Sequence, residues 1–333
     1  MPRVYVCRRA SRPPEIRGDL SDSVWAEAPW TDDFADIEGL DRPAPAHRTR
    51  AKLLWDDDAL YVAARLEEPH VWATLTRHDS MIFQDNDFEL FLDPDADNHL
   101  YLEWEINALG TTWDLLMGTP YRDGGPPVSG FELHGIVSKV AVQGTINDPG
   151  DTDEAWTLEA AIPWSAMKDV AYVPCPPRLG DWWRFNMSRV HWDTDVVDGC
   201  YVKRDQPEHN WVWSPPGVVD MHRPERWGWL RFSDGEGSHG AECPPYQDLH
   251  DFLGALYYAQ RRHREAHGRA SESLEALGLS ALLGTEVRLQ TTGNLWEASV
   301  RRDDDVWCIR HDSKIWRGEA YLVPNTRPDA IPP

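Results

Sequence analysis

The sequence predicts a mainly β protein: an antiparallel two-sheet β-sandwich followed by a small C-terminal α+β appendage. Many short stretches alternate apolar and polar residues at period two, and no helical stretch separates one strand pair from the next. The composition shifts toward Gly, Ser and Pro at 233–245, and a helical pattern follows. We therefore expect a sandwich at 1–235 and a separate helix plus small antiparallel sheet at 246–333.

The most informative stretch, 85–114, predicts two strands joined by an acidic turn. One face is apolar and carries Phe88, Leu90 and Leu92, then Leu100, Leu102, Trp104 and Ile106. The other face carries Asp87, Glu89, Phe91 and Asp93, then Tyr101, Glu103, Glu105 and Asn107. The apolar face is expected to form a core, and the polar face is a candidate functional surface. The alternative is a solvated outer face of an ordinary acidic protein.

Other stretches supply the remaining elements. A hairpin is expected over 48–56 and 60–67, and single strands over 131–143, 155–162, 182–192 and 227–232. A helical turn capped by Ser21 or Asp22 is expected to point Trp25 inward. The segments 118–129 and 193–225 are predicted to be loops. In the appendage we expect a helix over 246–277 and strands over 286–291, 295–301 and 306–310.

Composition excludes several function classes. The net charge of -23, from 33 basic and 56 acidic residues, would repel a nucleic-acid backbone or an anionic membrane surface. No run approaches the ~18 apolar residues of a membrane helix, and no signal-peptide pattern is visible, so a cytoplasmic protein is expected. The five cysteines lack metal or redox spacing and are typical of free thiols. The 18 Trp exceed what the core needs, so some are expected where indoles stack on sugars or partner side chains.

A succession of motifs resembles one known family. The motifs are IRGDLSDSVW, AKLLWDDDALYVAARLEEP, DNDFELFLDPD, YLEWEINALGTTWDL, WTLEAAIPW, WWRFNMSRV and RPERWGWLRFS. Over roughly 15–233 their order is similar to that of the family 9 carbohydrate-binding modules and their relatives in the DOMON-like β-sandwich superfamily. The resemblance implies a two-sheet sandwich of jelly-roll type, a sugar cleft on the polar face of the long strands, and calcium with a structural role.

The resemblance also implies binding positions. The family's glutamate and asparagine on the two central strands correspond to Glu89 and Asn107, and an arginine that binds sugar hydroxyls corresponds to Glu105. The two tryptophans that clamp a sugar ring fall on Phe83 and near Met221, so neither is matched. Stacking residues from other positions, Trp113, Trp192, Trp211 and Trp213, could replace the clamp or could belong to the core. The expected ligand-binding residues are Arg77, Phe83, Glu89, Glu105, Asn107, Trp113, Asn186, Arg189, Trp211, Trp213 and His222.

The function expected from these features is saccharide binding in a cleft on the polar face. The alternative is a carbohydrate-active enzyme of glycoside hydrolase or lyase type, with acid and base groups drawn from Glu89, Glu105, His78 and Asp79. The appendage is expected to contact a protein partner or a second copy of the chain. Nucleic acid and membranes are not expected partners.

A calcium site is expected at Asp93, Asp95 and Asp97, which offer oxygen ligands at alternate positions. The alternative is an acidic turn whose side chains cap their own backbone, and Asp57 or Asp85 could supply ligands elsewhere. The DOMON-like cytochromes suggest one further reading, in which Met81 and His222 hold a haem.

Overall fold

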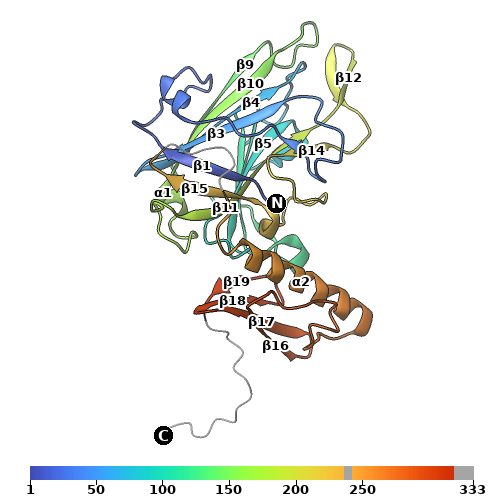
Figure 1. The fold of residues 1–333 in the computed structure, drawn as a ribbon. Coiled ribbons are helices and arrows are strands. Elements are labelled where there is room, and N and C mark those ends of the chain that lie inside the picture. The colour runs from blue at the N-terminus through green and yellow to red at the C-terminus, as the bar shows by residue number, and fades with distance from the viewer. Residues whose placement is uncertain (236–241, 319–333) are drawn as a thin grey trace. The chain divides into compact units, whose positions relative to one another are not determined.

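The structure is a computed structural model and describes residues 1–235 and 242–318. The chain divides into two compact units, 1–243 and 244–333 (Figure 1). Strands make up most of the regular structure in the described residues, so the mainly β prediction is confirmed. Among the described residues, no helix has the length and apolar character that crossing a membrane requires.

The first unit contains fifteen labelled strands, and most of them join one sheet. They are β1 Val4–Arg9, β2 Ala35–Asp36, β3 Thr49–Trp55, β4 Ala59–Glu67, β5 Asp87–Asp93, β6 Tyr101–Asn107, β7 Thr112–Met117, β8 Pro127–Val128, β9 Val137–Gln143, β10 Ala155–Pro163, β11 Trp182–His191, β12 Thr194–Val197, β13 Cys200–Lys203, β14 His209–Val212 and β15 Gly228–Ser233. Its helices are α1 Trp164–Met167 and the 3-10 turns η1 Ser23–Glu27, η2 Ile82–Gln84, η3 Tyr121–Asp123 and η4 Pro224–Arg226. The hairpin of β12 and β13 forms a sheet of its own.

The large sheet has thirteen strands and curls into two layers around one core (Figure 1). Its order is β8-β7-β6-β5-β11-β15-β1-β3-β4-β10-β9, and β14 pairs with both β11 and β2. Apolar side chains from both layers meet in a single cluster, to which β4 contributes Val62, β5 contributes Leu90 and β11 contributes Phe185. The period-two pattern of the sequence thus places its apolar face in the core, and the sandwich prediction is confirmed.

Strand β1 joins the two layers, and it pairs in parallel with both of its neighbours. Val4 lies opposite Trp229 of β15, and Arg9 lies opposite Trp55 of β3. The other strand pairs are antiparallel, as predicted. The sequence analysis assigned no strand to 4–9, because this segment is too short to show a clear alternation.

Local signals and structure agree at several other places. Asp22 caps η1 by accepting a hydrogen bond from the Val24 amide, and Trp25 is buried, as predicted. The hairpin of β3 and β4 turns at 56–58. The prediction of a loop over 193–225 is wrong in part, because β12, β13 and β14 lie within it.

The second unit packs one helix on a small sheet. Helix α2 spans Gln247–His267, and the strands are β16 Glu286–Thr292, β17 Leu295–Arg302, β18 Asp305–Arg310 and β19 Ile315–Arg317 in the antiparallel order β16-β17-β18-β19. Leu253 and Leu256 of the helix share a buried cluster with Val300 and Ile309 of the sheet. This unit therefore has a core of its own. Its contact with a protein partner or second copy stays a prediction.

We predict that Gly228→Ala destabilises the first unit by about 1–3 kcal/mol through overpacking. A Cβ at this position would lie 2.3 Å from the Trp213 ring and 2.8 Å from the Arg3 carbonyl oxygen, beside the parallel joint. Chemical denaturation measures the loss. The control Gly118→Ala has no atom within 4 Å of the added Cβ and should change stability little. Equal stability of the two variants would contradict close packing at the joint.

Candidate functional site

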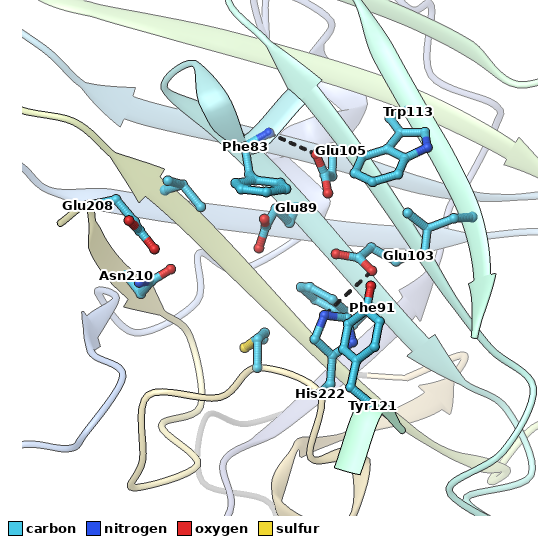
Figure 2. Close-up of a pocket in the computed structure, with 13 residues that line it drawn as sticks. Phe83, Glu89, Phe91, Glu103, Glu105, Trp113, Tyr121, Glu208, Asn210 and His222 are labelled. Carbon is cyan, nitrogen blue, oxygen red and sulfur yellow. Dashed lines mark hydrogen bonds and ion pairs between the residues drawn. The ribbon is translucent and has the colours of Figure 1, made fainter. Parts of the chain in front are cut away.

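A pocket of about 240 Å³ opens on the polar face of β5, β6 and β7 (Figure 2). The segment before β5, the start of β14 and the loop at 221–222 complete its walls. The lining residues are Phe83, Glu89, Phe91, Glu103, Glu105, Trp113, Leu115, Tyr121, Val190, Glu208, Asn210, Met221 and His222. We call this the acidic pocket. Four of its residues are glutamates, and among the described residues that line it none is Lys or Arg.

The register of β5 against β6 places the carboxyl groups together. Glu89 lies directly opposite Glu105, and Phe91 lies opposite Glu103. On the next strand Trp113 lies opposite Glu105. Like charges directly opposite each other destabilise an antiparallel pair, so this arrangement costs stability unless protons or a cation neutralise it.

Asp87 adds a fourth carboxyl group from the same two central strands. Oxygen atoms of Asp87, Glu89 and Glu105 lie within 4.8 Å of one another. Asp87 is fully buried; its Oδ1 accepts a hydrogen bond from the Val190 amide, whereas its Oδ2 accepts none. Glu105 accepts a 2.9 Å hydrogen bond from the Phe83 amide.

Burial and mutual repulsion raise the pKa of each of these carboxyl groups. Burial is the largest cause for Glu89, whose pKa rises to about 7, and the charge of Glu208 adds to it. Burial and neighbouring carboxylates raise the pKa of Asp87, Glu103 and Glu105 well above the usual range. At neutral pH the cluster therefore holds protons that free carboxyl groups would have released.

Aromatic rings form the other walls of the acidic pocket. Phe83, Phe91, Trp113 and Tyr121 line it, and Figure 2 shows Phe83 and Trp113 on either side of the Glu105 side chain. His222 lies in contact range of Tyr121, with ring centroids 4.4 Å apart. Burial lowers the pKa of His222 to about 4, so this ring is neutral at neutral pH.

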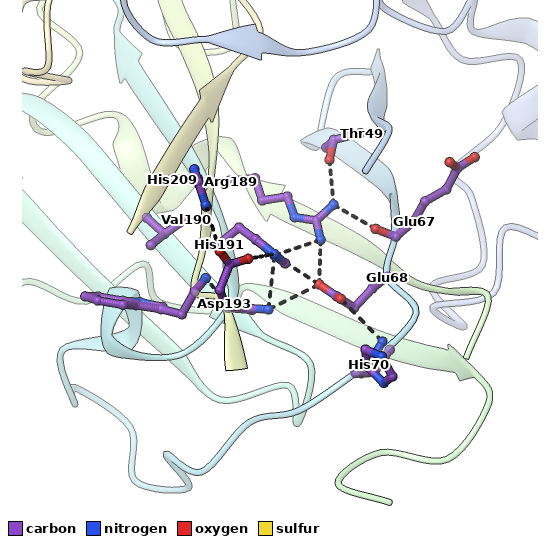
Figure 3. Close-up of polar contacts among 12 residues, drawn as sticks. Thr49, Glu67, Glu68, His70, Arg189, Val190, His191, Asp193 and His209 are labelled. Carbon is purple, nitrogen blue, oxygen red and sulfur yellow. Dashed lines mark hydrogen bonds and ion pairs between the residues drawn. The ribbon is translucent and has the colours of Figure 1, made fainter. Parts of the chain in front are cut away.

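A second polar pocket, of about 200 Å³, is lined by His191, whereas the preceding residue of β11, Val190, lines the acidic pocket. Its lining also includes Glu68 and Asn86. Figure 3 shows the polar contacts around His191. The guanidinium of Arg189 donates to Glu68 over 2.6 Å, and the Asn86 amide donates to the same carboxylate over 3.1 Å. Although burial opposes it, the contacts with His191 and Arg189 lower the pKa of Glu68 to about 2. We call this set the Arg189 network; its carboxylate is paired with a buried cation.

Two other groups of side chains carry predicted site residues. In the turn after β5, oxygen atoms of Asp93, Asp95 and Asp97 lie within 4.8 Å of one another, a donor set that suits calcium. The Nε2 atom of His78 lies 3.3 Å from a carboxylate oxygen of Asp79 and 3.2 Å from one of Glu132. The His78 side chain is 47% exposed. His78 and Asp79 do not line the acidic pocket.

A protein-family model described as carbohydrate family 9 binding domain-like matches residues 16–175. The matched region holds β3 to β10, and with them the central strands of the acidic pocket. A search of curated proteins finds no match to the chain.

A solved structure resembles the sandwich in fold. A candidate carbohydrate-binding protein from Bacteroides uniformis aligns with a TM-score of 0.53 and 17% identity, covering 70% of this chain and 100% of its own. A family 9 module from Caldicellulosiruptor kristjanssonii in complex with cellotriose aligns with a TM-score of 0.44 and 16% identity, covering 73% of this chain and 100% of its own. A family 9 module from the same organism in complex with glucose aligns with a TM-score of 0.42 and 17% identity, covering 72% of this chain and 100% of its own.

The sandwich brings five of the predicted ligand-binding residues into the acidic pocket: Phe83, Glu89, Glu105, Trp113 and His222. Met221, which stands near the second clamp position of the resemblance, also lines it. Both positions implied for the clamp therefore lie at the same pocket, although neither holds tryptophan.

Asn107 and Asn186 do not line the acidic pocket. The Asn107 amide donates to the Leu75 carbonyl, and its side-chain oxygen accepts from the amides of Leu109 and Thr111. The Asn186 amide donates to the Ser214 carbonyl. Both side chains are buried and hold loops against the sheet, because backbone groups there need partners.

The other predicted binding residues also lie outside the acidic pocket. Arg189 is buried in the Arg189 network, and the Trp211 ring stacks on His191 with centroids 4.8 Å apart. Trp213 packs on Phe185 in the core. Arg77 is exposed in the loop before η2. For Trp211 and Trp213 the physical reason is burial of the indole, because a buried ring stabilises the core more than a solvent-exposed ring would.

The haem alternative receives no support from the positions of its two residues. Met81 is 57% exposed and does not line the acidic pocket, whereas His222 does. His222 also contacts the hydroxyl of Tyr101, 2.9 Å from its Nδ1. Its ring is thereby held against the sheet.

The sequence analysis missed several lining residues. Glu208 and Asn210 belong to the segment around β14, which was predicted to be a loop, and Tyr121 lies in the Gly- and Pro-rich segment after β7. Glu103 was placed on the polar face but was not named as a site residue. Its alternation with Glu105 was the signal that could have identified it.

The enzymatic alternative stays a prediction. Burial and repulsion raise the pKa of both Glu89 and Glu105. The other two residues named for it, His78 and Asp79, lie outside the acidic pocket.

We predict that Glu89 makes stability fall as pH rises from about 4.5 to about 7. Its folded pKa of about 7 exceeds the unfolded value of 4.5, so in that range the folded state holds a proton that the unfolded state has lost. The unfolding free energy of the wild type relative to Glu89→Gln should fall by up to about 3 kcal/mol across the range. Urea denaturation at several pH values measures it. The lowered pKa of His222 makes stability rise with pH instead, but this contribution is the same in the wild type and in Glu89→Gln. Parallel curves of unfolding free energy against pH for the two proteins would contradict the raised pKa of Glu89.

Proposed function

We propose that the sandwich binds a saccharide in the acidic pocket. The observation that carries the proposal is the juxtaposition of aromatic rings and carboxyl groups on strands whose register is fixed by the core. The match of residues 16–175 to the family model described as carbohydrate family 9 binding domain-like supports the ligand class. The family 9 modules whose solved structures contain cellotriose and glucose agree with that class as well.

Each group in the pocket has a role that suits a sugar. The rings of Phe83 and Trp113 present apolar faces on which the C–H face of a pyranose packs. Glu89, Glu103 and Asn210 offer acceptors and donors to hydroxyl groups. The volume of about 240 Å³ is below the range of drug-sized sites, which favours one ring or the end of a chain.

Calcium at the turn after β5 would give the sandwich a structural cation. Asp93, Asp95 and Asp97 would hold it, since carboxylate oxygens are the ligands it prefers and Asp93 Oδ1 accepts no hydrogen bond. The cation would neutralise repulsion in the turn that connects β5 and β6. Those are the strands that carry the acidic pocket.

We predict that saccharide affinity depends on the rings of the acidic pocket. A glycan array identifies a ligand, and calorimetry then compares Trp113→Ala and Phe83→Ala with the wild type. Each variant should lose about two- to tenfold in affinity, because a well-placed ring contact contributes roughly 0.5–1.5 kcal/mol. The control Tyr172→Ala removes a ring that is 69% exposed outside the pocket and should bind as the wild type does. No binding to any saccharide on the array would contradict the proposal.

We predict that calcium raises the melting temperature and that a chelator reverses the rise. At a hundredfold excess over its Kd, a ligand of the folded state adds about 2.7 kcal/mol of stability. Asp95→Asn should abolish the shift, whereas Asp205→Asn, an exposed residue outside the turn, should keep it. Differential scanning calorimetry with and without calcium measures it. A shift that survives Asp95→Asn would place the ion elsewhere.

A further inference from the structure

The two polar pockets of the first unit differ in how their charge is balanced. Val190 and His191 are consecutive residues of β11, so they point to opposite faces, the first to the acidic pocket and the second to the Arg189 network. In the Arg189 network a buried guanidinium lies 2.6 Å from the buried carboxylate of Glu68. The protein thus supplies its own cation on one face of the strand.

The acidic pocket contains no comparable cation. Glu89, Glu103, Glu105 and Glu208 line it, and among the described lining residues none is Lys or Arg. A carboxylate oxygen of Asp87 lies within 4.8 Å of oxygen atoms of Glu89 and Glu105. Asp87 Oδ2 is buried and accepts no hydrogen bond, and His222 is neutral at neutral pH. Buried carboxylates are normally paired, so the missing positive charge is a property that a ligand can supply.

We propose that the acidic pocket selects a saccharide that carries a protonated amine, an amino sugar rather than a neutral one. The inference rests on the proposed function and names the substrate class of the same site. An ammonium group donates three hydrogen bonds, and carboxylates on neighbouring strands are the acceptors that strengthen such bonds most. The rings of Phe83, Phe91 and Trp113 add their electron-rich faces, to which a cation is attracted.

A ligand cation fits the pocket better than a bound metal does. A calcium ion needs six to eight oxygen atoms at about 2.3–2.6 Å around one point. Asp87, Glu89 and Glu105 form a close group, but Glu103 and Glu208 do not belong to it. Figure 2 shows these carboxylates spread along the pocket between aromatic rings, with Glu208 near Asn210 and Glu103 near Tyr121. Charge spread over such a length suits an ammonium group on a larger organic ligand.

The test is calorimetry at pH 7 with matched sugars in the gluco, galacto and manno series. Each series compares the free amine with its N-acetylated and hydroxyl counterparts, so that shape is kept while charge changes. The best amino sugar should bind at least tenfold more tightly than both neutral counterparts. Glu105→Gln should reduce that preference at least fivefold, and Glu208→Gln, at a half-buried position, provides a second variant if the first does not fold. Glu154→Gln, whose side chain is 74% exposed outside the pocket, should keep it.

The outcomes separate the two proposals. Equal or tighter binding of neutral sugars would overturn the amine preference and leave saccharide binding standing. Absence of binding for every sugar, charged or neutral, here and on the glycan array, would overturn both. A calcium-dependent rise in melting temperature that Asp87→Asn abolishes, without an amine preference, would assign the carboxylates to a metal and would also overturn the inference.

Discussion

The register between β5 and β6 is the constraint on which the rest of the first unit depends. Because side chains alternate, one register places Phe88, Leu90 and Leu92 in the core and at the same time puts Glu89 opposite Glu105 on the other face. A slip by one residue would expose the apolar set and bury the carboxyl groups in the core. The apolar residues therefore stabilise the one register in which the carboxyl groups repel each other.

Strand β11 contributes side chains to the core, to the Arg189 network and to the acidic pocket. Phe185 and Met187 point into the core, and farther along the same face Arg189 and His191 form the polar network at its end. On the opposite face Val190 reaches the acidic pocket, and its amide holds Asp87. The carboxylate paired with Arg189 and the carboxyl groups of the acidic pocket, which have no paired cation among the described lining residues, are thus separated by the thickness of one sheet. Charge contacts are stronger in a buried, low-dielectric site. The charge balance of each pocket therefore affects which ligand charges it can accept.

The sequence predicts the strands that alternate strongly and fails where the pattern is weak. The central strands, the β3–β4 hairpin and η1 follow from period two and from the Asp22 cap. The parallel pairing of β1 and the short strand β14 do not follow from such local signals. Their pairing depends on residues more than a hundred positions away, or on a register that no local pattern shows. For the site, alternation predicted that Glu89 and Glu105 share one face of the sheet, and they lie opposite each other in the lining of the acidic pocket. It did not distinguish Asn107, which serves its own loop, from a ligand-binding amide, because both need a polar side chain on the same face.

The cost of the acidic pocket also determines how it would respond to a ligand. Carboxyl groups whose pKa values are raised by burial and by one another keep protons at neutral pH, and this reduces their repulsion while the pocket is empty of positive charge. An arriving cation lowers those same pKa values, so binding it and releasing protons are coupled steps of one equilibrium. The Arg189 network needs no such exchange, since its guanidinium keeps Glu68 ionised. The two faces of one strand therefore differ in charge balance: one pairs its carboxylate with a buried guanidinium, and the other holds carboxyl groups whose protons a ligand cation could replace.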